Sequence, residues 1–210
     1  MAEIRTERGL DRLVNFSDAT VAIAITILIL PLVDVSSKIT DMTLWEFLRT
    51  NSGEVIGFVI SFWVIGRFWM VHHRVFEWVD SYSTGLLWAN LLWMAGIVTV
   101  PFAANLLANA QNGRGDVYGF YIGSMVVTSG AMVLIEYLLM RNPALLTERG
   151  RGQVDLVRAC CAPLLLLVAT VLASLYPNVG MFWVLLMLLS TPLYLLLNRV
   201  FGRRGSQSGS

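Results

Sequence analysis

Six long apolar segments constrain this chain more than any other feature of its sequence. They are separated by short polar stretches, and they cover residues 13–32, 55–76, 84–108, 117–140, 156–176 and 181–201. A helix of ~20 apolar residues crosses the ~30 Å hydrocarbon core of a bilayer and satisfies its backbone hydrogen bonds internally. The sequence therefore predicts an all-α integral membrane protein with six transmembrane helices, forming one transmembrane domain over residues 1–210 with a flexible tail at 202–210.

The composition agrees with a chain whose solvent is lipid. Hydrophobic residues make up 56% of the chain and charged residues 14%, whereas soluble domains carry ~25% charged residues. The net charge of +1 gives no reason to expect a nucleic-acid partner. Cys160 and Cys161 are neighbours on a predicted helix, so they point ~100° apart and are unsuited to a disulfide or to one metal. We expect no metal and no cofactor.

Basic residues predict the orientation in the membrane. With the N-terminus in the cytoplasm, twelve of the 15 basic residues fall on the inner side, and the outer loops hold Lys38, Arg49 and Arg114. Because inner loops carry the excess of Lys and Arg, we expect both termini to be cytoplasmic. The chain would then be a multi-pass protein of the cell (plasma) membrane.

Polar side chains within the first three spans fall at a common depth. Asp18 lies just inside the first span, and Trp69, His72, His73 and Asn90 lie at matching depth in the second and third. A carboxylate in lipid needs donors, and indole, imidazole and carboxamide groups supply them. We expect one hydrogen-bonded cluster that clamps the first span to the next two. The alternative is that Asp18 caps a helix start or faces water.

The first span also has an apolar stripe. At 100° per residue, Ile23, Ile27 and Leu30 lie within an arc of ~60°, and Asp18 lies near the opposite side. If copies of this helix converge on an axis, these side chains form apolar rings that close a pore by dewetting, a hydrophobic gate. Stripes of this kind more often pack against neighbours or lipid, and the pattern alone leaves that alternative open.

Three other polar side chains in or beside the spans are candidates for a role. Thr26 lies beside the stripe and would offer its hydroxyl to an ion or bond back to its own helix. Asp34 would ring the outer mouth and raise the local cation concentration. Arg67 lies inside the second span, where it would pair with Glu136 or extend toward the surface.

The first three spans resemble those of a known family. The first opens with Arg12-x-x-x-Phe16-Ser17-Asp18, which resembles the signature of the transmembrane protein 175 family of bacterial and endolysosomal potassium channels. The resemblance continues in Phe68-Trp69-Met-Val-His72-His73-Arg74-Val-Phe76, in Asn90-Leu-Leu and in Pro101-Phe102. It covers about half of the chain, since the last three spans are merely apolar.

The resemblance implies a function. Prokaryotic members have six spans per chain and form homotetramers in which four first helices line the pore. The family's constriction lies five, nine and twelve positions after the motif Asp, which in this chain are Ile23, Ile27 and Leu30. The implied protein is a potassium-preferring cation channel in a lipid bilayer, passing K⁺ and other monovalent cations and catalysing no reaction. The sequence has no Thr-Val-Gly-Tyr-Gly filter.

Two other functions remain as alternatives. A secondary transporter would use helices broken by proline, and Pro101, Pro163, Pro177 and Pro192 lie in or beside the spans, but no paired halves are visible. A proton pathway would use the His and Asp layer, but the first span is apolar beyond Thr26. An enzyme is disfavoured, because the only two His are adjacent and no catalytic set or cofactor motif is present.

Overall fold

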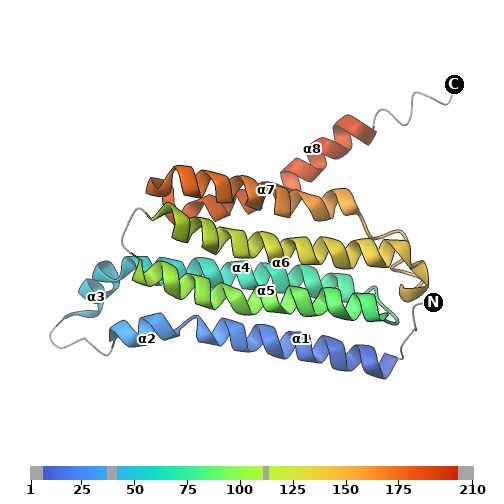
Figure 1. Ribbon diagram of the computed structural model, residues 1–210, viewed down its shortest axis with the longest axis horizontal. Coiled ribbons are helices and arrows are strands. Elements are labelled where there is room, and N and C mark those ends of the chain that lie inside the picture. The colour runs from blue at the N-terminus through green and yellow to red at the C-terminus, as the bar shows by residue number, and fades with distance from the viewer. Residues whose placement is uncertain (1–6, 37–41, 111–113, 203–210) are drawn as a thin grey trace.

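The computed structural model describes residues 7–36, 42–110 and 114–202 and forms an elongated bundle of helices (Figure 1). Within these described residues, six helical segments are long and apolar enough to cross a membrane, which confirms the predicted all-α, six-span fold. Four spans are single helices, namely α4 (Ser52–Phe76), α5 (Thr84–Asn109), α6 (Gly115–Arg141) and α7 (Leu156–Leu175). The first and last spans are each divided into two pieces.

The first span breaks near its end instead of running unbroken over residues 13–32. It consists of α1 (Glu7–Ile27) and α2 (Leu30–Ser36). Pro31 explains the break, because it has no N–H for the carbonyl of Ile27 and its ring clashes with that carbonyl. The backbone instead makes a weak 3.4 Å hydrogen bond from the N–H of Ile29 to the carbonyl of Thr26.

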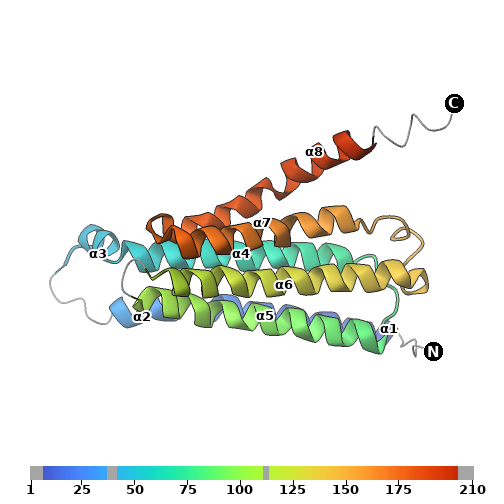
Figure 2. The same ribbon diagram turned by 45° about the horizontal axis from the view of Figure 1, so that its top comes forward.

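The last span begins earlier than the sequence predicts and is also divided. It consists of the 3₁₀-helix η2 (Pro177–Leu189) followed by α8 (Ser190–Gly202). Gly180 has φ 63°, a left-handed conformation that glycine adopts without a steric penalty. Pro192 lies in the first turn of α8, where a missing N–H is tolerated. The helix α8 leans away from the other helices (Figure 2).

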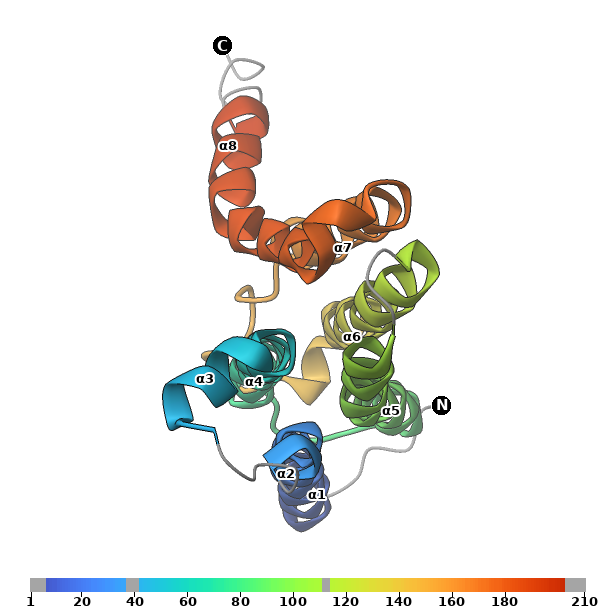
Figure 3. The same ribbon diagram turned by 90° about the vertical axis from the view of Figure 1, so that its left-hand side faces the viewer.

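The centre of the bundle is the tight pairing of α5 with α6. A Cβ atom added at Gly96 of α5 would lie 3.1 Å from the Cα atom of Thr128 on α6, so glycine permits this close approach. Trp93, Ile97 and Tyr121 are completely buried nearby. An end-on view places α1 and α2 on one side of this pair and α7 on the other (Figure 3).

The loops at one end of the bundle are tied together. The backbone N–H of Thr147 donates to the carbonyl of Trp78 at 2.8 Å, and that of Asp80 donates to the carbonyl of Leu145, in the turn η1 (Pro143–Leu145), at 2.9 Å. The helix α1 begins, and α8 ends, at this same end (Figure 1). The two ends of the described chain therefore share one side of the bundle. Residues 203–210 of the expected flexible tail lie outside the described residues.

The opposite end carries the short helix α3 (Leu44–Thr50). Its N-terminus is closed by a capping box, in which the Thr43 side chain accepts a hydrogen bond from the backbone N–H of Glu46 and the Glu46 carboxylate accepts one from the backbone N–H of Thr43. Trp45 is largely exposed on this helix. The helix thus presents an amphipathic surface just beyond the spans.

Candidate pore-lining helix and its polar anchor

The face of α1 that packs against the other helices is held to α4 by a side-chain hydrogen bond. The indole Nε1–H of Trp69 donates to Oδ1 of Asp18 at 2.9 Å. The Trp69 ring in turn stacks on the ring of His73, with 5.3 Å between centroids. The aromatic pair fixes the indole so that its N–H faces the carboxylate of α1.

A second set of hydrogen bonds joins α1, α4 and α5. The amide Nδ2 of Asn90 donates to Oγ of Ser17 at 2.8 Å, and Oδ1 of Asn90 lies 2.8 Å from Nε2 of His72. All three side chains are completely buried. The His72 ring lies between the rings of Phe76 and Trp93, at centroid distances of 4.2 and 4.0 Å. Because Oδ1 accepts only, the Nε2 atom of His72 carries the proton in this arrangement.

We call Ser17, Asp18, Trp69, His72 and Asn90 together the polar anchor. The structure brings these residues to one layer, as expected, but it divides them into two separate sets. Neither histidine bonds to Asp18, so that part of the prediction is wrong. Instead His72 bonds to Asn90, and Nε2 of His73 lies 3.4 Å from Oε1 of Glu77.

The hydrogen bond between Ser17 and Asn90 was not predicted from the sequence. Ser17 lies on the buried stripe of α1, in register with Leu13, Val21, Ala24 and Leu28. A buried serine on an apolar stripe needs a hydrogen-bond partner, so its position on this stripe could have indicated a bond to a neighbouring helix. The other two motif residues, Arg12 and Phe16, lie on exposed positions of the same helix.

The opposite face of α1 and α2 is open. Ile23, Ile27 and Leu30 are 60%, 42% and 50% exposed. With Val98 and Phe102 of α5 they line an apolar groove of about 290 Å³. The three residues of the predicted constriction thus share a face that the rest of this chain covers only in part.

The two polar candidates near this stripe are both exposed. The hydroxyl of Thr26 donates to the carbonyl of Ile23 at 2.8 Å, which is the bond back to its own helix. This bond leaves the lone pairs of the hydroxyl oxygen available to a cation. Asp34 is exposed on α2, beyond Leu30.

Arg67 has a different partner from the one considered. Its Nη2 donates to Oγ of Ser190 at 3.0 Å. Glu136 lines the same cavity, but among the described residues it lies farther than 4 Å from the Arg67 guanidinium nitrogens. Of the two alternatives for Arg67, the ion pair with Glu136 is therefore wrong.

These features define a class of protein. The chain is a multi-pass α-helical membrane protein whose first span is anchored to the bundle by polar contacts on one face and left open on the other.

Comparison with known proteins shows which family the chain resembles. Residues 12–101 match the family model described as "Endosomal/lysosomal potassium channel TMEM175". The resemblance to that family stated from the sequence is therefore confirmed over these residues, and the family is one of channels, not enzymes. Across the whole bundle, a crystal structure of a lysosomal potassium-selective channel TMEM175 homolog from Chamaesiphon minutus superimposes with a TM-score of 0.65. The superposition covers 94% of this chain and 98% of that one at 22% identity, so it supports the fold.

Two curated relatives are named potassium channels. One, from Chryseobacterium sp. (strain P1-3), is 28% identical over 130 residues, which are 62% of this chain and 65% of the relative. The other, from Streptomyces collinus, is 37% identical over 97 residues, which are 46% and 47% of the two chains. The matched segments thus span about half to two thirds of the length of these relatives.

Proposed function

We propose that this chain forms a potassium-preferring cation channel, as a homotetramer whose pore is lined by α1 and α2. The single observation that carries the proposal is the exposed apolar stripe of Ile23, Ile27 and Leu30 on the motif-bearing helix. Relatives named potassium channels support the choice of ion. The proposed placement is the cell (plasma) membrane, with both termini cytoplasmic.

The need for several copies follows from the shape of one copy. In one chain this stripe lies on a single helix, and one helix cannot enclose a pore. Four copies of α1 around an axis would turn the stripe inward and form stacked rings of branched side chains. Such rings exclude water when narrow and admit it when they widen, which makes them a gate.

The anchor gives the open face a fixed direction. Ser17 and Asp18 are bonded to α4 and α5, so the opposite side of α1 must face away from the bundle. No Thr-Val-Gly-Tyr-Gly segment is present to replace the hydration shell of the ion. We therefore expect potassium selectivity to depend on the side chains of the constriction and to be modest.

Ion flux into liposomes tests the proposal. Purified protein should pass K⁺ faster than Na⁺, at rates above those of transporters, with little proton flux. Ile23→Asn should raise the flux and weaken the K⁺ preference, because a polar ring holds water in the constriction. The matched control is Leu167→Asn, an equally apolar exposed position on α7.

Each outcome separates the alternatives. Equal effects of Ile23→Asn and Leu167→Asn on ion flux would show that Ile23 does not lie at the constriction. Slow, saturable flux would indicate a secondary transporter, and proton flux without K⁺ flux would indicate a proton pathway. Native mass spectrometry should give four chains, and a monomer active in flux would contradict the shared pore.

A further inference from the structure

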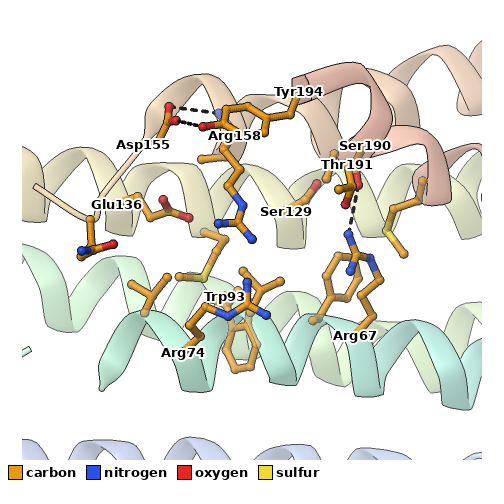
Figure 4. A pocket seen from close by; sticks show the side chains of 18 of the residues that line it. Arg67, Arg74, Trp93, Ser129, Glu136, Asp155, Arg158, Ser190, Thr191 and Tyr194 are labelled. Atoms are coloured by element: carbon orange, nitrogen blue, oxygen red, sulfur yellow. Dashed lines mark hydrogen bonds between the residues drawn. The ribbon is translucent and has the colours of Figure 1, made fainter. Parts of the chain in front are cut away.

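A cavity of about 430 Å³ lies away from the open face of α1, among α4, α5, α6, α7 and the junction of η2 with α8 (Figure 4). Its size is typical of small-molecule sites, which have volumes of ~300–1,000 Å³. Much of its wall is apolar, including Val71, Met132 and Leu195. No residue of the polar anchor or of the proposed pore stripe lines it, although Trp93 in its wall stacks on His72 of the anchor.

Three arginines reach into this cavity from opposite walls. Figure 4 shows Arg158 of α7 extending toward Arg67 and Arg74 of α4. Within the described part of the chain, none of the three guanidinium groups lies within 4 Å of a carboxylate oxygen. Of the three, only Arg67 has a side-chain hydrogen-bond partner among the residues that the structure describes, the hydroxyl of Ser190. Three like charges are thus held around one space with most of their donors unused.

Trp93 adds an unused donor from the floor of the cavity. Its side chain is completely buried, and its Nε1–H has no hydrogen-bond partner among the described residues. The ring is fixed by stacking on His72. A buried N–H without a partner is costly, so an acceptor that enters the cavity and reaches this donor would be stabilised by it.

The two carboxylates of the cavity do not cancel this charge. Asp155 is engaged at the start of α7, where Oδ2 accepts from the Tyr194 hydroxyl at 2.7 Å and Oδ1 from the backbone N–H of Val157 at 2.9 Å. Glu136 lies at one side of the cavity (Figure 4). Three guanidinium groups against two carboxylates leave one positive charge in excess.

We propose that this arginine cavity binds the phosphate group of an anionic ligand, with the headgroup of a membrane phospholipid as the favoured source. Guanidinium groups bind phosphate through paired N–H donors, and an indole N–H adds a directed one. Basic pockets between transmembrane helices suit lipid headgroups. The apolar wall beside the arginines offers a surface for the first carbons of an acyl chain. The proposal does not depend on the function proposed for α1.

Binding to the purified full-length protein tests the site. Delipidated protein in detergent is titrated with phosphatidylglycerol, phosphatidylcholine, glycerol phosphate or inorganic phosphate, followed by native mass spectrometry and by thermal shift. Phosphatidylglycerol should bind most tightly. The double variant Arg67→Gln/Arg158→Gln should weaken it about tenfold or more, as expected when charged hydrogen bonds are lost.

Matched variants separate local recognition from general charge. Arg199→Gln removes an arginine of α8 that does not line the cavity and should leave the affinity unchanged. Trp93→Phe keeps the aromatic ring and removes only the N–H, so it should weaken binding severalfold while the elution volume on size exclusion stays that of the parent. If the glutamine variants fail to fold, Arg67→Lys, which retains the charge, replaces them in the binding measurement.

The outcomes are decisive in both directions. Tight binding of glycerol phosphate or inorganic phosphate, lost in the same variants, would support the phosphate site and assign it a soluble ligand. Equal binding of phosphatidylcholine and phosphatidylglycerol, unchanged in the arginine variants, would overturn it. Failure of all four probes to bind, or equal losses in Arg199→Gln, would overturn it as well.

Discussion

The indole N–H of Trp69 on α4 is bonded to the carboxylate of Asp18 on α1 at 2.9 Å, and this bond lies on the face of α1 opposite the apolar stripe. Together with the bond from Asn90 to Ser17, this contact fixes the rotation of the helix that we propose lines the pore. The energetic consequences can be measured by substitution at each partner.

Asp18→Ala and Trp69→Phe should each destabilise the protein by about 1–2 kcal/mol, because each removes one partner of a hydrogen bond to a carboxylate. The double variant should cost less than the sum, with a coupling energy of about 1 kcal/mol. Unfolding in mixed detergent micelles with SDS provides the measurement. Trp88→Phe, at an exposed indole of α5, should have little effect, and a coupling energy near zero would show that the bond contributes nothing.

Asn90→Leu should be more damaging, at about 2–4 kcal/mol, since it leaves two buried groups, Ser17 and His72, without their shared partner. Ser17→Ala should cost less, because only one Asn90 donor loses its acceptor. The same SDS unfolding assay ranks the two. Asn105→Leu, on an exposed position of the same helix, is the control, and equal losses at Asn90 and Asn105 would contradict the importance of the buried set.

Gly96→Ala should destabilise the α5–α6 pair by about 1–3 kcal/mol through overpacking, because a Cβ there would lie 3.1 Å from Cα of Thr128. The backbone position of Thr128 prevents a simple side-chain shift from relieving the contact. Gly130→Ala on α6 has open space within 4 Å and should be neutral or stabilise by up to about 1 kcal/mol through helix propensity. A neutral result at Gly96 would mean that the two helices separate at little cost.

Asp34→Asn should reduce cation flux severalfold at low ionic strength and have little effect near 1 M salt, where the Debye length is only ~3 Å. Liposome flux at several KCl concentrations measures the difference. Asp116→Asn removes an exposed carboxylate at the start of α6 and should leave the flux unchanged. A loss of flux that does not depend on salt, or an equal loss in Asp116→Asn, would show that Asp34 does not lie at the mouth of the pore.

The six-span architecture could be predicted because apolar length is a property of each segment alone. Residues 84–108 of the sequence, for example, nearly coincide with α5, where Ser83 accepts a hydrogen bond from the backbone N–H of Leu86 and defines the start. Depth counted along each span similarly indicated the layer that holds Asp18, Trp69 and Asn90.

The partners within that layer could not be predicted, because they depend on the rotation of each helix and on close packing. Asn90 bonds to Ser17 rather than to Asp18, a difference of one residue and ~100° on α1. The cavity beside Arg67 could not be predicted from the sequence either, because it depends on how far η2 and α8 lean from α4. Its unused Trp93 N–H is visible only once the packing is known.

The break after Ile27 has a consequence for any motion of the first span. Ile27 belongs to α1, which the polar anchor fixes, whereas Leu30 and Asp34 belong to α2, which continues from α1 through residues 28–29. In the proposed tetramer, bending at those two residues would displace Leu30 and Asp34 without breaking a hydrogen bond of the anchor. The rings of Ile23 and Ile27 could then keep their positions while the ring of Leu30 widens or narrows.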